Sequence, residues 1–275
     1  MYFRGICNII LLVFFLGKNM EKLFDINEQG YSVRCKLFCD KDIHSIDKVV
    51  IATHGFGGFK DNKSVEKFAE RIDTKYKGFG IITFDWPCHG QDARKKLLIS
   101  ECQTYLQLVI DYAREHFKAK TLYNYSVSFG GYNTLKYIKD HGNPFDRIAL
   151  RSTSVKLYDI MSSTISEDDY KKLSKGKEVL AGRDRKMKIS HEFLESLKTI
   201  DEEISSFDYI DYADSLLMIH GTLDDSVPIE NAREFSEKNI IELIEVEKAD
   251  HRFSDPKRMD FAIQKIIDFF APHSN

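Results

Sequence analysis

The 275-residue sequence is poor in cysteine and proline, with five of each, and neither basic nor acidic residues are in excess. The cysteines are Cys7, Cys35, Cys39, Cys88 and Cys102. Their odd number and irregular spacing argue against a disulfide framework and favour a reducing, cytoplasmic compartment. Lys and Arg number 40 against 43 Asp and Glu, so no basic excess indicates a nucleic-acid partner. With 15 glycines and 43% hydrophobic residues, the composition is that of a globular protein and not of a disordered or fibrous chain.

The first 19 residues contain an apolar run, 6–17, in which Asn8 is the single polar residue. A spanning helix needs about 20 apolar residues, so this run predicts no stable membrane span. Its length, with Arg4 ahead of it, is that of a signal-peptide core, which would imply export or membrane association. No small-x-small cleavage site or lipidated cysteine follows, and the alternative is an upstream translation with Met20 as the true start. We expect residues 1–19 to precede the first strand and to be dispensable.

From residue 20 onward, strand-like runs alternate with amphipathic helical patterns, which is typical of one α/β domain with a mostly parallel sheet over 20–275. The predicted strands are 31–39, 48–53, 80–84, 122–127, 147–150, 215–219 and 241–246. The predicted helices are 65–76, 105–116, 132–138 and 259–270.

The segment from about 156 to 206 interrupts this alternation, because it is rich in Ser, Lys, Asp and Glu with only scattered apolar residues. A structureless loop of that length is uncommon in a compact domain. We therefore expect an inserted lid with its own helices, and we expect it to set substrate choice. Leu157, Leu180 and Phe193 are among the apolar residues that could cover a hydrophobic group.

Ser128 lies in the segment Ser126-Val-Ser-Phe-Gly130, where a strand is expected to turn sharply into a helix. A nucleophile on such a turn is lifted out of the sheet, and small residues two before and two after it relieve crowding. The usual pattern is Gly-x-Ser-x-Gly, so Ser126 departs from it. Placing Ser126 itself at the nucleophile position would put Asn124 at a small-residue position, which fits less well.

A glycine-rich segment, His54-Gly-Phe-Gly-Gly58, directly follows the first buried strand. Glycines let a backbone N–H point at a developing oxyanion, and the N–H groups of Phe56 and Phe129 are the expected donors. A dinucleotide-binding loop does not fit, because Lys60 stands where its third glycine would be.

Asp224 and His251 each follow a predicted strand, at the sheet edge where ligand sites of open α/β folds lie. The order Ser128, Asp224, His251 is the nucleophile–acid–histidine order of one fold class and differs from those of chymotrypsin and subtilisin. Asp225 is the alternative acid, but Asp224 follows the His220-Gly pair at the usual spacing.

These segments, together with Asp85-Trp-Pro-Cys-His-Gly90, resemble the α/β-hydrolase superfamily over about 49–270. The medium-sized insertion is similar to that of small-lid esterases, including cinnamoyl and feruloyl esterases. The resemblance implies an α/β-hydrolase fold and a serine hydrolase that cleaves a small-molecule carboxylic ester. It implies Ser128 as nucleophile, His251 as general base and acid, and Asp224 as the residue that orients His251.

Other activities of the same fold stay open: an acyltransferase, a thioesterase, an aminopeptidase, or a non-catalytic binding protein. A serine at position 128 argues against dehalogenases and epoxide hydrolases, which use aspartate. The resemblance implies no cofactor and no metal, and the spacing of Cys35 and Cys39 does not suggest a zinc site. The sequence does not indicate an oligomeric state. His54, His89 and His220 are expected to brace loops.

Overall fold

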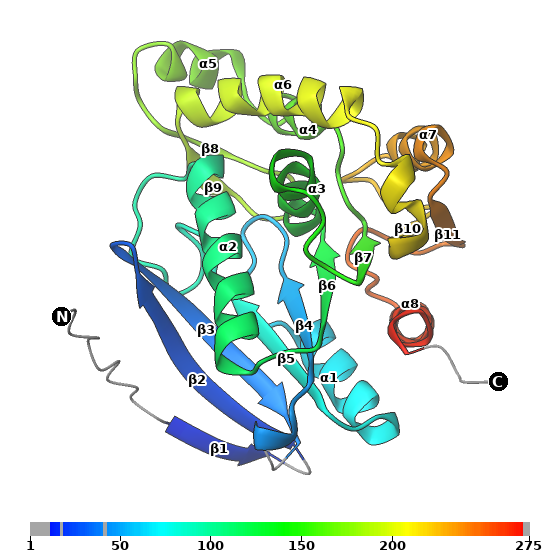
Figure 1. Ribbon diagram of the computed structural model, residues 1–275. Coiled ribbons are helices and arrows are strands. Elements are labelled where there is room, and N and C mark those ends of the chain that lie inside the picture. The colour runs from blue at the N-terminus through cyan, green and yellow to red at the C-terminus, as the bar shows by residue number, and fades with distance from the viewer. Residues whose placement is uncertain (1–11, 17–18, 41–42, 272–275) are drawn as a thin grey trace.

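A nine-stranded sheet organises the protein, in a computed structural model that describes residues 12–16, 19–40 and 43–271. The sheet begins with three antiparallel pairings and continues with six strands that are all parallel (Figure 1). In spatial order the strands are β1 (Leu12–Leu16), β2 (Asn19–Glu28), β3 (Tyr31–Cys39), β5 (Phe79–Phe84), β4 (Lys48–Thr53), β6 (Thr121–Val127), β7 (Arg147–Arg151), β10 (Leu216–Gly221) and β11 (Glu242–Val246). The predicted α/β-hydrolase fold with a mostly parallel sheet is confirmed.

Helices cover both faces of the sheet because the central strands are apolar on both faces. In β4, Val49 and Ile51 join the core on one face, whereas Val50 and Ala52 join the core on the other. The second of these faces is covered by α1 (Lys63–Lys75) and α8 (Pro256–Phe270). The first face is covered by α2 (Ile99–His116), α3 (Phe129–His141), α6 (His191–Ser206) and α7 (Ile229–Asn239).

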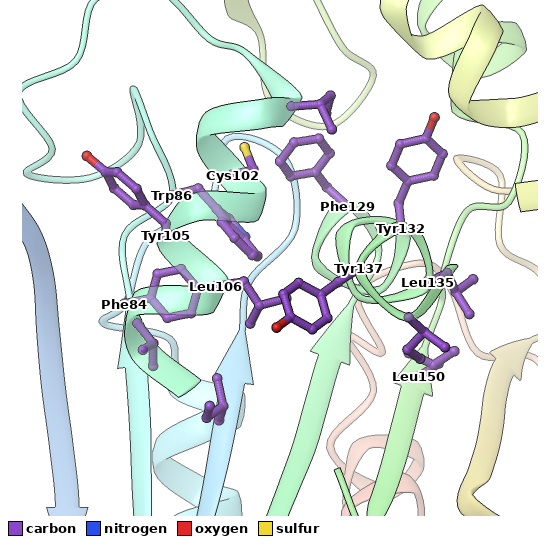
Figure 2. Packing of buried hydrophobic residues seen from close by; sticks show 14 of the residues in the cluster. Phe84, Trp86, Cys102, Tyr105, Leu106, Phe129, Tyr132, Leu135, Tyr137 and Leu150 are labelled. Atoms are coloured by element: carbon purple, nitrogen blue, oxygen red, sulfur yellow. The ribbon is translucent and has the colours of Figure 1, made fainter. Parts of the chain in front are cut away.

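Aromatic side chains fill the layer between the sheet and α2 and α3 (Figure 2). Trp86 packs edge-on against Phe84 with 4.6 Å between ring centroids, and Phe129 lies on its other side at 6.3 Å. Phe129 is fully buried at the first position of α3. The residue after Ser128 is therefore anchored in the core, which fixes the backbone at the turn.

The segment 156–206 contains its own secondary structure. It comprises α4 (Leu157–Ser162), α5 (Glu167–Leu173), the small antiparallel pair β8 (Val179–Ala181) and β9 (Met187–Ile189), and α6. In Figure 1 it lies at the top, beyond the carboxyl ends of β4, β6 and β7. Phe193 and Leu197 of α6 are fully buried in the core, whereas Leu180 is 54% exposed. Leu180 therefore points to solvent. The expectation that it could cover a hydrophobic group is wrong.

One expectation about the N-terminus is wrong. Leu12–Leu16 forms β1 and pairs with β2, so the sheet begins before residue 19. Residues 1–11 and 17–18, the rest of the segment expected to be signal-like or an upstream translation, lie outside the described residues. β2 and α7 are not among the predicted strands and helices. Two short 3₁₀ turns, Ile43–Ser45 and Ile210–Ser215, complete the described elements.

Candidate active site

Ser128 stands at a strained turn between β6 and α3. Its backbone has φ 52° and ψ −114°, a region that non-glycine residues rarely occupy, and its N–H donates to the Arg151 carbonyl at 3.0 Å. A Cβ on Gly130 would lie 2.1 Å from Oγ1 of Thr53, so only glycine fits there. The turn thus raises the Ser128 hydroxyl above the end of β6.

Ser126 is tolerated in place of the usual glycine because its hydroxyl is fully satisfied. It is completely buried, donates to the Asn124 side-chain oxygen at 2.6 Å, and accepts from Oγ1 of Thr53 at 2.8 Å. Oγ1 of Thr134 lies 2.9 Å away. A buried hydroxyl with these partners carries little desolvation penalty. Its burial also keeps it away from the pocket, so it is Ser128 that the turn presents.

His251 joins the two other predicted residues. Its Nε2 lies 3.2 Å from Ser128 Oγ, and its Nδ1 lies 2.8 Å from Asp224 Oδ2. Asp225 is exposed and contacts no nitrogen of His251. The structure therefore brings Ser128, His251 and Asp224 together, and it leaves Asp225 outside.

The Asp224 carboxylate is buried and saturated with donors. Oδ1 accepts from the N–H groups of Ser226 and Val227 at 3.0 and 2.7 Å, and Oδ2 lies 3.2 Å from His220 Nε2. Burial acts to raise the pKa of Asp224, but the bonds from His220, His251 and Val227 outweigh it and hold that pKa well below its usual range. The carboxylate stays ionised beside the imidazole.

Phe56 and Phe129, whose backbone N–H groups are the predicted oxyanion donors, line the same pocket as Ser128. Within residues 12–16, 19–40 and 43–271, neither the Phe56 N–H nor the Phe129 N–H donates to another group. The loop carrying Phe56 approaches closely because Gly55 has no side chain: a Cβ there would lie 3.2 Å from Ser128 Cβ. The buried Asp85 carboxylate fixes this loop by accepting from the Lys60 and Gln91 N–H groups at 2.7 and 2.9 Å.

The three histidines that the sequence predicts to hold loops each contact a backbone carbonyl. His54 Nδ1 lies 2.8 Å from the Gly55 carbonyl, His89 Nδ1 lies 2.8 Å from the Pro87 carbonyl, and His220 Nε2 lies 2.9 Å from the Val227 carbonyl. Burial lowers the pKa of His89 to about 4 and that of His54 well below its usual range. Both imidazoles stay neutral and hold the loops around the site.

A pocket of about 480 Å³ opens above Ser128. Leu157, Ile160 and Met161 of α4 supply an apolar wall. The loop 182–186, between β8 and β9, crosses above: Arg185 donates to the Gly57 carbonyl at 2.7 Å, and Arg183 donates to the Asp225 carbonyl at 2.5 Å.

Arg151 and the other basic side chains around this pocket are not among the site residues predicted from the sequence. An arginine at a strand end carries no motif, and its surroundings come from residues distant in the sequence. The basic run 183–186 is visible in the sequence, but its position over the site is not.

The described part of the chain contains no group of three or more His, Cys, Asp or Glu side chains arranged to hold a metal ion. Cys35 and Cys39 are buried in β3, and Cys7 lies outside the described residues. No helix among the described residues is both long enough and apolar enough to span a membrane.

The profile of the alpha/beta hydrolase fold family matches residues 48–185, just over half of the chain. The protein therefore belongs to this family, as the motif order predicts. A search of curated proteins with the sequence finds no match.

Solved structures share the fold over nearly the whole chain. Est1E from Butyrivibrio proteoclasticus, with ferulic acid bound, has a TM-score of 0.73 at 17% identity, covering 90% of this chain and 97% of its own. An esterase domain from Rhodothermus marinus gives 0.64 at 17% identity, covering 92% and 98%. A serine hydrolase without a lid from Xanthomonas campestris gives 0.61 at 15% identity, covering 93% and 97%. At 15–17% identity these structures show that the fold is shared.

Proposed function

We propose that the protein is a serine hydrolase that cleaves a carboxylic ester through an acyl-enzyme on Ser128. One observation carries the proposal: the Ser128 hydroxyl, the His251 imidazole and the Asp224 carboxylate form a continuous chain of contacts of 3.2 and 2.8 Å at the base of a pocket. The substrate is a small-molecule ester, because the pocket volume is about 480 Å³.

In the first half-reaction, His251 Nε2 takes the Ser128 proton as Oγ attacks the ester carbonyl carbon. The negative charge that develops on the carbonyl oxygen is stabilised by the Phe56 and Phe129 N–H groups, which have no other acceptor among the described residues. When the tetrahedral intermediate collapses, His251 gives its proton to the leaving alcohol oxygen, and the acyl group stays on Ser128.

In the second half-reaction, water replaces the alcohol. His251 takes a proton from the water, whose oxygen attacks the acyl carbon, and the proton returns to Ser128 Oγ as the carboxylic acid leaves. Asp224 accepts the Nδ1–H of His251 throughout, which keeps Nε2 free as the base and stabilises the imidazolium.

The 156–206 insertion acts in this proposal as a lid that selects the substrate. Its α4 contributes Leu157, Ile160 and Met161 to the pocket, which suits an aliphatic or aromatic group of the ester. Covering the pocket limits water and positions the substrate, and the effect differs from one ester to another.

The test is a substrate panel: p-nitrophenyl esters of increasing acyl length, hydroxycinnamate methyl esters, and an aminoacyl naphthylamide. We expect turnover of esters, and a loss of about 10⁶-fold in kcat for Ser128→Ala. Ser126→Ala, which removes a buried hydroxyl outside the pocket, is the matched control and should retain turnover.

Hydrolysis of the naphthylamide alone would indicate an aminopeptidase. Formation of a new ester with an added alcohol, in place of the acid, would indicate an acyltransferase. Undiminished turnover in Ser128→Ala would overturn the proposal.

A further inference from the structure

The charge around the pocket differs sharply from that of the whole chain. The whole chain has 40 basic and 43 acidic residues. Among the described residues that line the pocket, five are basic and Asp184 is the single carboxylate. The basic residues are Lys63, Arg151, Arg183, Arg185 and Arg252. The pocket therefore concentrates positive charge where a substrate enters.

Most of this charge is not neutralised by the protein. Arg252 pairs with Asp184 at 2.9 Å. Within the described ranges 12–16, 19–40 and 43–271, none of the other four basic side chains forms an ion pair. Arg183 and Arg185 donate to backbone carbonyls, which are neutral, and both are exposed. Water solvates an exposed cation, so these two arginines need no counter-charge, whereas a buried cation does.

Arg151 is that buried cation. It is 3% exposed, at the carboxyl end of β7, and its backbone carbonyl accepts from the Ser128 N–H. Its guanidinium donates through Nε to Tyr125 Oη at 3.1 Å and through Nη1 to the Arg252 carbonyl at 3.3 Å, and it lies 5.0 Å from the Phe253 ring centroid.

None of these partners is an anion, and Nη2 of Arg151 has no acceptor among the described residues. Arginine is almost never fully buried without a charged partner, because the protein interior solvates the charge poorly. A side chain needed only to pack on Phe253 would not carry this charge. Since Arg151 lines the pocket, a bound anion can supply the missing counter-charge.

The side chains around Arg151 and the apolar side chains of α4 belong to cores on opposite faces of the sheet. Tyr125 and Phe253, which surround Arg151, belong to the core on the α1 and α8 face of the sheet, whereas Leu157 and Met161 belong to the core on the other face. Lys63 and Ser64, the first residues of α1, also line the pocket, and the amino end of this helix adds positive potential to it. Ser128 lines the same pocket.

We propose, given the ester hydrolysis proposed above, that the substrate carries a carboxylate that binds Arg151, with an apolar group against α4. Arg151 is then a specificity-determining residue that contacts the substrate away from the scissile bond. Lys63 adds attraction without a fixed contact. The carboxylate belongs to the alcohol part or to the acyl part of the ester, and two pairs of probes distinguish these.

The test compares matched neutral and anionic esters. For the alcohol part the pair is 4-carboxyphenyl and 4-carbamoylphenyl butyrate. For the acyl part it is the p-nitrophenyl monoester of succinate and its succinamide analogue. In one of the two pairs we expect kcat/KM to favour the carboxylate by about 10–100-fold, the range of a charge-assisted hydrogen bond. Raising the ionic strength should reduce the preference.

Substitutions assign the preference to residues. Arg151→Gln should remove most of the carboxylate preference while the amide ester is still hydrolysed, and Arg151→Lys should restore part of it. Lys63→Gln, at an exposed position, should weaken the preference without any folding risk, and Arg114→Gln, an exposed residue that does not line the pocket, is the control.

Equal kcat/KM for carboxylate and amide esters in both pairs, in the wild-type protein, would overturn this inference and leave ester hydrolysis standing. A preference that persists in soluble Arg151→Gln would also overturn it. Absence of turnover for all four esters, with no labelling by a serine-directed fluorophosphonate, would instead overturn the proposed function.

Discussion

The strand-end loops and the insertion each contain a hydrogen-bonded carboxylate, Asp224 in the loops and Asp201 in the insertion, and the pKa values of the two are shifted in opposite directions. The strand-end loops are 54–58, 126–130, 221–227 and 249–253, and the insertion is 156–206. In the loops, Asp224 is buried with four donors, and its pKa is held well below the usual range. In the insertion, the half-buried Asp201 accepts from Tyr132 Oη at 2.8 Å and from the N–H groups of Leu157 and Tyr158 at 3.0 and 2.8 Å. Burial outweighs these bonds and raises the pKa of Asp201 to about 6.

This difference separates the residues proposed to react with the substrate from the residues proposed to select it. The pKa of Asp224 lies well below its usual range, so this carboxylate keeps its bonds to His251 and to the loop 221–227 across neutral pH. The insertion joins α4 to α6 and α3 through a carboxylate that titrates near pH 6, and its loop 182–186 is held by exposed arginines. We expect changes in the loops to alter rate for all substrates, and changes in the insertion to alter preference among them.

After Ser128→Ala, the largest effect should come from Asp224 in the strand-end loops. Asp224→Asn should lower kcat by up to about 10⁴-fold, since an amide cannot hold the productive His251 tautomer. Asp225→Asn, its exposed neighbour, is the matched control and should be mild. Steady-state kinetics on two esters of different size, with circular dichroism to verify folding, measure this. A larger loss of kcat for Asp225→Asn than for Asp224→Asn would show that Asp225 is the acid and would contradict the assignment to Asp224.

A smaller effect should follow from the apolar wall of the insertion. Ile160→Ala enlarges the pocket beside α4 and should lower kcat/KM for bulky esters by about 10-fold while p-nitrophenyl acetate is little affected. Leu180→Ala, which removes an exposed side chain of the same insertion, is the control. Equal losses for small and bulky esters would mean that the insertion contributes stability and not selection.

The smallest effect concerns pH and the insertion. Asp201 has a folded-state pKa raised to about 6, so its contribution to stability is fully present below the unfolded pKa of about 3.9 and is lost as pH rises through about 6. Asp201→Asn cannot ionise. Its free energy of unfolding relative to wild type should therefore be higher at about pH 7.5 than at about pH 4.5, by on the order of 1 kcal/mol.

Thermal denaturation at the two pH values measures the Asp201 effect, with Glu195→Gln, an exposed carboxylate of the same helix, as control. A wild-type-to-variant difference that does not change with pH would contradict it.

The core elements could be predicted from the sequence because their patterns are local. The continuous apolar run of β4 and the helical spacing of Val65, Phe68 and Ile72 are readable without tertiary information. β2 was also within reach, since Phe24 and Ile26 are buried and alternate with the polar Asp25.

The candidate site divides in the same way. Ser128, Asp224 and His251 follow strand ends, and parallel strands bring such positions to one edge of a sheet. The lack of an anionic partner for Arg151 could not be predicted, because it depends on Tyr125 and Phe253, which come from a neighbouring strand and from a loop about 100 residues away in sequence. The position of the loop 182–186 over the site has the same origin, in contacts distant along the chain.

Covalent labelling by a fluorophosphonate tests the central claim most directly, because it requires a serine activated by the strand-end loops and does not depend on the substrate. We predict one adduct per chain, located on Ser128 by peptide mass spectrometry, and none in Ser128→Ala. Labelling that persists in Ser128→Ala, or an adduct that maps to Ser126, would contradict the account.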